Sequence, residues 1–196
     1  YLNECRQRGI PVLVPDVNVS QSNFTALVGR TESPAVDRGR PEGVSEGGSG
    51  DEVPPPTPLP DAIPFGLSAV RNVGEGLVAL IVAEREAGGP FSDFYEFCER
   101  VDTAVLNKRT IESLIKAGAF DSMGHPRRGL LTVYERIVDI TVARRRERDM
   151  GVMTLFGEAD ADGGAGFDER PRIPDLHFDK RQQLAFEKEM LGLYVS

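Results

Sequence analysis

The sequence predicts a mainly helical protein with a small β-containing N-terminal piece and two stretches that build no core of their own. Three observations support this fold class. Apolar residues recur at spacings of three and four in several windows after residue 76, which is the period of an amphipathic helix. Short extended runs occur only before residue 68. Glycine, proline and acidic residues dominate residues 30–60 and a second stretch near 157–170.

The end of a helix and short extended runs are expected at the N-terminal side. Apolar residues among basic and amide ones in residues 1–10, with Gly9 as a stop, are typical of a helix end. Residues 11–15 form an extended run bounded by prolines, and residues 24–28 form a second apolar run. We expect this second run to pair as a β-hairpin with residues 63–67.

The abrupt change of composition at residues 30–60 predicts a disordered insertion. This stretch holds 7 prolines, 5 glycines and no aromatic residue. It cannot bury enough apolar surface to offset the entropy that ordering would cost. Residues 54–56 are three consecutive prolines, which favour polyproline II. They are either a ligand for a proline-recognising partner or part of a solvated insertion in the loop of the expected hairpin.

Four windows with helical periodicity follow the insertion: residues 77–86, 107–117, 127–148 and 178–191. The first places Leu77, Leu80 and Ile81 at helical spacing. The second has Asn107 as a candidate N-cap and Gly118 just past its end. The third has arginines around a less polar stripe, which consists of Leu130, Leu131, Tyr134, Ile137, Val138 and Thr141.

The composition restricts the classes of function. The net charge is −8, but residues 61–150 hold 13 basic and 14 acidic side chains, so any contact with nucleic acid there must be local. Cys5 and Cys98 lie far apart and only two histidines accompany them, which argues against a zinc site. No apolar run is long enough to span a membrane, and the few cysteines suit the cytoplasm.

The most informative motif is a tight turn, Asn72-Val73-Gly74, between two expected helices. Asn and Gly suit turn positions with positive φ, because a β-carbon is costly there. The turn leads through Gly76 into a helix N-terminus, whose free amides and positive dipole favour a phosphate. The window resembles the helix-hairpin-helix motif, with three further positions that fit: Val78, Ile81 and Arg85. A glycine-turned pair of helices without a ligand is the alternative.

Four tracts, the first of which contains this turn, resemble in order and spacing the bacterial DNA polymerase III alpha subunit, a C-family replicative polymerase. They read IPFGLSAVRNVGEG, PFSDFYEFCERVD, LNKRTIESLIKAGAFDSMG and LAFEKEMLGLYVS. The leading stretch, YLNECRQRGIPVLVPDVNVSQSNFT, is similar to the end of the fingers region of that family. We therefore expect an internal fragment of such a subunit.

The resemblance implies a place for each part of the chain. Residues 1–29 would end the fingers, residues 61–150 would be a tandem helix-hairpin-helix domain that holds duplex DNA, and residues 151–196 would be an acidic linker and a helix leading to an OB-fold domain. The second hairpin unit would comprise residues 94–117 with its turn at 102–106. Lys108 and Arg109 would then lie near a phosphate, or else be simply solvated.

The resemblance also implies the partners and the chemistry. Primer–template duplex DNA would be the partner of this fragment, and the sliding clamp and other polymerase III subunits would be partners of the parent enzyme. Mg²⁺ would belong to the parent's active site. No catalytic or metal-binding residue is expected here, because Asp160 and Asp162 lie in the linker and we interpret Glu187 and Glu189 as surface charges of a helix.

The arginines of residues 144–148 either contact DNA or form a solvated helix end whose charge suits the helix dipole. Two alternatives to a replicative polymerase stay open. One is the error-prone polymerase of the same family, although the tract EKEMLGLYVS is more similar to the replicative branch. The other is a helix-hairpin-helix interaction module of a DNA-repair protein.

Overall fold

The computed structural model describes residues 2–25, 62–150 and 170–195. Three expectations therefore lie outside the described residues. These are the insertion at 30–60 with its three prolines, the acidic linker at 151–169, and the placement of Asp160 and Asp162 in that linker.

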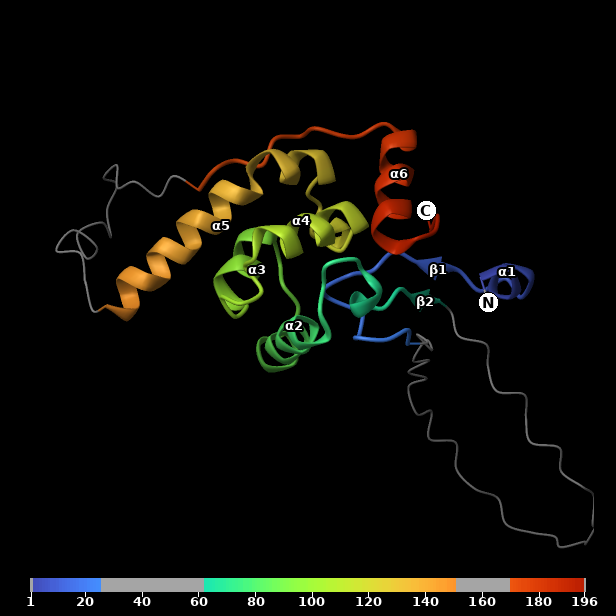
Figure 1. Cartoon of the computed structure of the whole chain (residues 1–196), viewed down its shortest axis with the longest axis horizontal. Coiled ribbons are helices and arrows are strands. Elements are labelled where there is room, and N and C mark those ends of the chain that lie inside the picture. The colour runs from blue at the N-terminus through green and yellow to red at the C-terminus, as the bar shows by residue number, and fades with distance from the viewer. Residues whose placement is uncertain (1, 26–61, 151–169, 196) are drawn as a thin grey trace, which may run out of the picture.

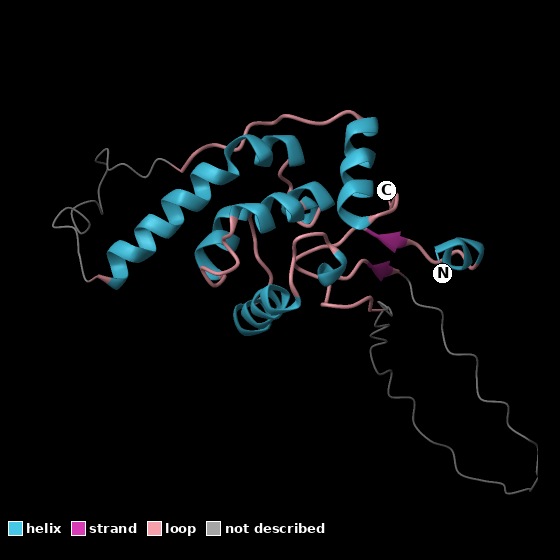
Figure 2. Ribbon diagram, viewed as in Figure 1, coloured by secondary structure: helices cyan, strands magenta, loops and turns pink. Residues whose placement is uncertain are grey.

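The described part of the chain is mainly helical, as the sequence predicts (Figures 1 and 2). The elements, in chain order, are α1 (Leu2–Gln7), β1 (Val12–Leu13), β2 (Ile63–Pro64), the 3-10 helix η1 (Leu67–Ala69), α2 (Glu75–Gly88), α3 (Phe94–Arg100), α4 (Lys108–Ala117), the 3-10 helix η2 (Asp121–Met123), α5 (Arg127–Asp149) and α6 (Lys180–Leu191).

The N-terminal piece contains a small parallel sheet in place of the expected hairpin. Helix α1 stops where Gly9 takes a φ of 70°, as predicted. Strand β1 then pairs in parallel with β2, with Val12 opposite Ile63. Residues 63 and 64 therefore pair with residues 12 and 13, and residues 24 and 25 are not in a strand, whereas residues 26–28 of the expected hairpin lie outside the described residues. Apolar residues indicate an extended run but do not choose its partner. Phe24 contributes its ring instead, which packs edge-on against Phe65 with centroids 4.5 Å apart.

A single apolar cluster joins α2, α3, α4, α5 and α6. Its centre is a group of phenylalanine rings packed edge to face or stacked: Phe91, Phe94, Phe97 and Phe120. In α2 the fully buried side chains are Val78 and Ile81, whereas Leu80 is 37% exposed. The helical spacing of this window was predicted correctly, but the buried stripe lies on Val78 and not on Leu80.

The expected helix signals work as caps. The side chain of Asn107 accepts a hydrogen bond from the Arg109 amide at 2.9 Å and begins α4. Gly118 ends this helix in the left-handed conformation, with a φ of 89°. Buried side chains of α5 follow the predicted stripe: Leu130, Tyr134, Ile137, Val138 and Thr141.

Helix α6 packs against α4 and contributes Met190 and Leu191 to the common core. It also holds Glu187, which is fully buried and not a surface charge as the sequence suggested. That interpretation was wrong because Glu187 lies on the same helix face as Met190 and has a buried partner, Arg127, 60 residues away in the chain. Glu189 is exposed, as expected.

Candidate nucleic-acid interface

The first hairpin turn contains a left-handed residue, but at one position only. Asn72 has a φ of 64°, as predicted for a turn that needs Asn or Gly. Gly74 has a φ of −79°, which any residue adopts, so the positive φ that the sequence suggested for the turn is found at Asn72 and not at Gly74. A β-carbon added at Gly74 or at Gly76 would meet no atom within 4 Å. The space next to the Cα atoms of Gly74 and Gly76 is therefore free of other described protein atoms.

Neighbouring helices hold this turn from behind. The Asn72 amide group donates from Nδ2 to Oγ of Ser113 on α4 at 3.1 Å, and Oγ of Thr110 lies 3.4 Å from the Asn72 carbonyl. The backbone amide of Arg71 donates to the carbonyl of Met190 on α6 at 2.9 Å. Val73 is buried, so its side chain anchors the turn and cannot reach a ligand.

The N-terminus of α2 carries no side-chain cap. Its N-cap is Gly74, whose carbonyl accepts hydrogen bonds from the amides of Leu77 and Val78. The earlier amides of the first turn point out of the helix, where its dipole favours an anion. Glu75 is the acidic residue of this first turn and is exposed, which reduces the positive potential locally.

The second hairpin unit is formed by α3, a turn at residues 102–106, and α4, as the resemblance implied. Its turn is closed by hydrogen bonds from Val105 to the Asp102 carbonyl and from Leu106 to the Thr103 carbonyl. At the start of α4 the Asn107 side chain already occupies an amide of the first turn. The two units therefore differ, because only the α2 start leaves its first amides without a side-chain acceptor.

Lys108 and Arg109 occupy the first turn of α4 but have different surroundings. The ammonium of Lys108 lies 2.9 Å from a carboxylate oxygen of Asp139 and 3.4 Å from one of Glu135, both on α5. The hydrogen bond to Asp139 is the main reason that the pKa of Lys108 is raised. Arg109 is exposed. Contact of either side chain with a phosphate stays a prediction.

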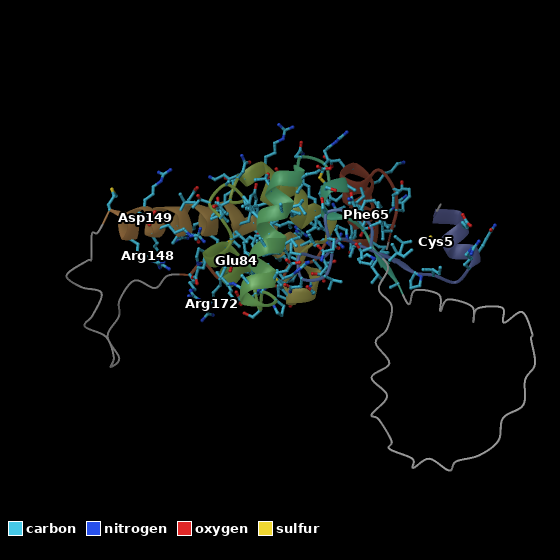
Figure 3. The ribbon with its side chains drawn as sticks, turned by 90° about the horizontal axis from the view of Figure 1, so that it is seen from below. Cys5, Phe65, Glu84, Arg148, Asp149 and Arg172 are labelled. Atoms are coloured by element: carbon cyan, nitrogen blue, oxygen red, sulfur yellow. The ribbon has the colours of Figure 1, made fainter. Side chains whose placement is uncertain are left out.

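Two arginines singled out in the sequence bind carbonyl groups of the protein itself. Arg85 donates from one nitrogen to the carbonyls of Val17 and Ser20, both at 2.9 Å, and burial lowers its pKa. Arg145 donates to carbonyls at the end of α3, including that of Val101 at 2.7 Å. Arg145 is therefore not simply solvated, and DNA contact by the arginines of residues 144–148 stays a prediction. Arg148 is exposed near the end of α5 (Figure 3).

Sequence reasoning missed Arg127, which joins four elements. Its guanidinium binds both carboxylate oxygens of Asp121, at distances from 2.6 to 3.1 Å, and lies 3.1 Å from Glu187. It also lies 3.4 Å from the Lys116 carbonyl. Burial alone lowers the pKa of Arg127, but the two carboxylates outweigh burial and raise it. An arginine with one arginine neighbour gives no sequence signal of such a role.

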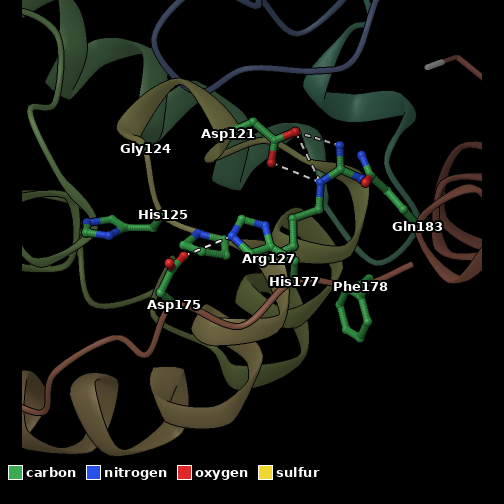
Figure 4. A pocket seen from close by; sticks show the side chains of 9 residues that line it. Asp121, Gly124, His125, Arg127, Asp175, His177, Phe178 and Gln183 are labelled. Atoms are coloured by element: carbon green, nitrogen blue, oxygen red, sulfur yellow. Dashed lines mark hydrogen bonds and ion pairs between the residues drawn. The ribbon is translucent and has the colours of Figure 1, made fainter. Parts of the chain in front are cut away.

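A cavity of about 330 Å³ opens beside Arg127 (Figure 4). Its walls include two histidines, and one of them, His177, lies 2.9 Å from a carboxylate oxygen of Asp175. Among residues 2–25, 62–150 and 170–195, no three His, Cys, Asp or Glu side chains are grouped to hold a metal ion. No helix in these ranges is both long and apolar enough to cross a membrane.

Comparison with known proteins agrees with the hairpin geometry. A family model described as a helix-hairpin-helix motif matches residues 9–130. The whole chain is 41% identical to part of the DNA polymerase III subunit alpha of Saccharopolyspora erythraea, 38% identical to that of Mycobacterium leprae, and 36% identical to that of Thermus aquaticus. It covers 14%, 14% and 13% of their lengths. The resemblance found in the sequence is confirmed.

Proposed function

Because this chain belongs to the helix-hairpin-helix family and matches alpha subunits of DNA polymerase III along its full length, we propose that it binds duplex DNA as part of a replicative DNA polymerase. The binding would take place at the turn of residues 72–76 and at the start of α4. In the full enzyme, this contact would hold the primer–template without taking part in the chemistry.

The observation that carries the proposal is the open, uncapped start of α2 within the matched family region. Open space at Gly74 and Gly76 lets a phosphate approach the first amides of the helix. The buried side chain of Val73 and the hydrogen bonds of Asn72 fix the backbone in place, so little order must be gained on binding. Contacts of this kind read the phosphate backbone and carry no sequence information.

The net charge of the chain limits its affinity for duplex DNA. A net charge of −8 opposes DNA at long range, and Lys108 already has two carboxylate partners. The isolated chain should therefore bind duplex DNA weakly, with an affinity that falls as salt rises. Exposed Arg109 would supply a side-chain contact at the second unit.

Further parts of the proposal concern the whole polymerase. It would synthesise DNA in the cytoplasm, with the sliding clamp and other polymerase subunits as partners. Mg²⁺ would act at the active site of the parent enzyme, as the resemblance implies. Residues 61–150 would form the tandem hairpin domain, residues 1–29 the end of the fingers, and residues 151–196 the connection to an OB-fold domain.

A pair of substitutions tests the proposal. Gly74→Val adds a branched side chain into open space at an ordinary φ, so the fold should stay intact while access to the amides is blocked. We expect at least about tenfold weaker binding to a short duplex, measured by fluorescence anisotropy at low salt. Gly89→Ala is the control at the other end of α2, where an added β-carbon also meets nothing within 4 Å. Its φ of 78° and ψ of 179° cost an alanine about 1–3 kcal/mol, so circular dichroism first verifies that this variant is folded.

Equal affinity of the folded Gly74→Val variant and the parent would exclude this turn as the DNA contact. Binding that does not respond to salt, or that selects one sequence, would contradict phosphate recognition. An absence of DNA binding in the parent at low salt would instead favour a protein-interaction module.

A further inference from the structure

Helix α6 reaches the backbone of the hairpin turn directly. The carbonyl of Met190, in its last turn, accepts the hydrogen bond of the Arg71 amide at 2.9 Å. Arg71 immediately precedes Asn72, the residue with positive φ. The position of the Met190 carbonyl therefore helps to decide where the turn lies relative to α4.

The rotation of α6 about its own axis is fixed by a charge. Glu187 precedes Met190 by three residues and lies on the same face of the helix. It has no exposed surface, and its carboxylate lies 3.1 Å from a guanidinium nitrogen of Arg127. Any rotation or shift of α6 that separated this pair would draw a buried carboxylate away from the guanidinium that faces it, which is unfavourable.

Arg127 cannot easily follow such a movement, because it is held by groups outside α6. Asp121 binds Arg127 through both carboxylate oxygens, and the Arg127 side chain is only 7% exposed. Gly118 lies against the guanidinium so closely that an added β-carbon would be 2.3 Å from one of its nitrogens. Contacts outside α6 thus hold the Arg127 guanidinium in place, and the Glu187 carboxylate binds it there.

We propose that the buried pair Arg127–Glu187 positions the DNA-contacting turn, by fixing α6 and through it the Met190 carbonyl that binds the Arg71 amide. The inference rests on the proposed function. An apolar pair could hold α6 to the core equally well, but it would accept several rotations of the helix. A charge pair favours one arrangement, as buried polar residues do in some helical assemblies.

The test separates positioning from stability. In the full chain, Glu187→Gln removes the charge and retains the shape, and Arg127→Leu combined with Glu187→Leu replaces the pair by apolar side chains. Asp121, which is 39% exposed, stays hydrated in the double variant. Glu189→Gln, at an exposed position two residues along α6, is the matched control. Three quantities are measured: the thermal midpoint, hydrogen exchange of the Arg71 amide, and affinity for a short duplex.

We expect the double variant to regain a thermal midpoint near that of the parent, because buried pairs are often replaceable by apolar side chains. Its Arg71 amide should nevertheless exchange about tenfold faster than in the parent, and DNA affinity should fall about fivefold or more. Glu187→Gln should show the same two changes, and Glu189→Gln neither. The proposal would be overturned if, in the double variant, the exchange rate of the Arg71 amide and the DNA affinity returned to the parent's values together with the thermal midpoint.

Arg71 exchange is observed without DNA, so it decides the positioning role even if the parent does not bind DNA. In that case the proposed function fails and the positioning of the turn is judged by itself. If Glu187→Gln does not fold, the double variant and Glu189→Gln still show whether the pair positions the turn and whether this affects DNA binding.

Discussion

Adding a single methyl group at Gly118 is expected to destabilise the fold far more than the size of the group suggests. The β-carbon of Gly118→Ala would lie 2.3 Å from one nitrogen and 2.6 Å from the central carbon of the Arg127 guanidinium. The guanidinium cannot swing away freely, because it is bound to Asp121 and Glu187. The alanine would therefore have to push Arg127 out of its ion pairs or move the end of α4.

Two contributions set the magnitude. Gly118 has a φ of 89°, and a left-handed conformation costs a non-glycine residue about 1–2 kcal/mol. Breaking a buried ion pair costs about 3–5 kcal/mol, because the remaining charge stays buried. Partial relaxation of the helix end lowers the second figure. We expect Gly118→Ala to reduce the free energy of unfolding by roughly 4 kcal/mol.

Gly124→Ala separates the two contributions. Gly124 has a φ of 75°, and its β-carbon would meet no atom within 4 Å, so only the conformational cost of about 1–2 kcal/mol applies. Urea unfolding of the full chain, followed by circular dichroism, gives both values. The reasoning is refuted if the two alanine variants unfold with the same free energy.

Three further predictions concern charge and thiol chemistry. Glu135→Gln combined with Asp139→Asn changes the summed charge of Lys108 and its two partners from −1 to +1. Affinity for duplex DNA should therefore rise about threefold to tenfold at low salt, which anisotropy titrations at two salt concentrations would check. Hydrogen bonds from a serine, and then an ion pair with an arginine, hold the pKa of Glu96 at about 2, against an ordinary value of 4.5. Its stabilising effect is therefore present above pH 4.5 and is lost as the pH falls toward 2, and the urea midpoint of Glu96→Gln should change less over that range. Burial raises the pKa of the Cys98 thiol, whereas Cys5 is half-buried. A disulfide reagent at neutral pH should therefore modify Cys5 alone until urea unfolds the chain, and prompt reaction of both thiols would contradict this.

Local signals were sufficient for much of the helical framework. Asn107 and Gly118 act as the ends of α4 because capping depends on the backbone conformation of one or two residues. The left-handed turn at Asn72 could be predicted for the same reason. Pairing of the short strands could not, because an extended run of two or three residues carries no information about its partner, and Phe24 packs its ring where a strand pair was expected.

The sequence by itself determined the class of fold, the family, and the turn that we propose to contact DNA, since each depends on residues that are close together in the chain. The tertiary structure decided which charged groups are available. Lys108 faces two carboxylates of α5, Arg145 binds the end of α3, and Glu187 is buried against Arg127. Partners of this kind lie 27 to 60 residues away, and the periodicity of one helix cannot tell a solvated charge from a charge that meets its opposite inside the core.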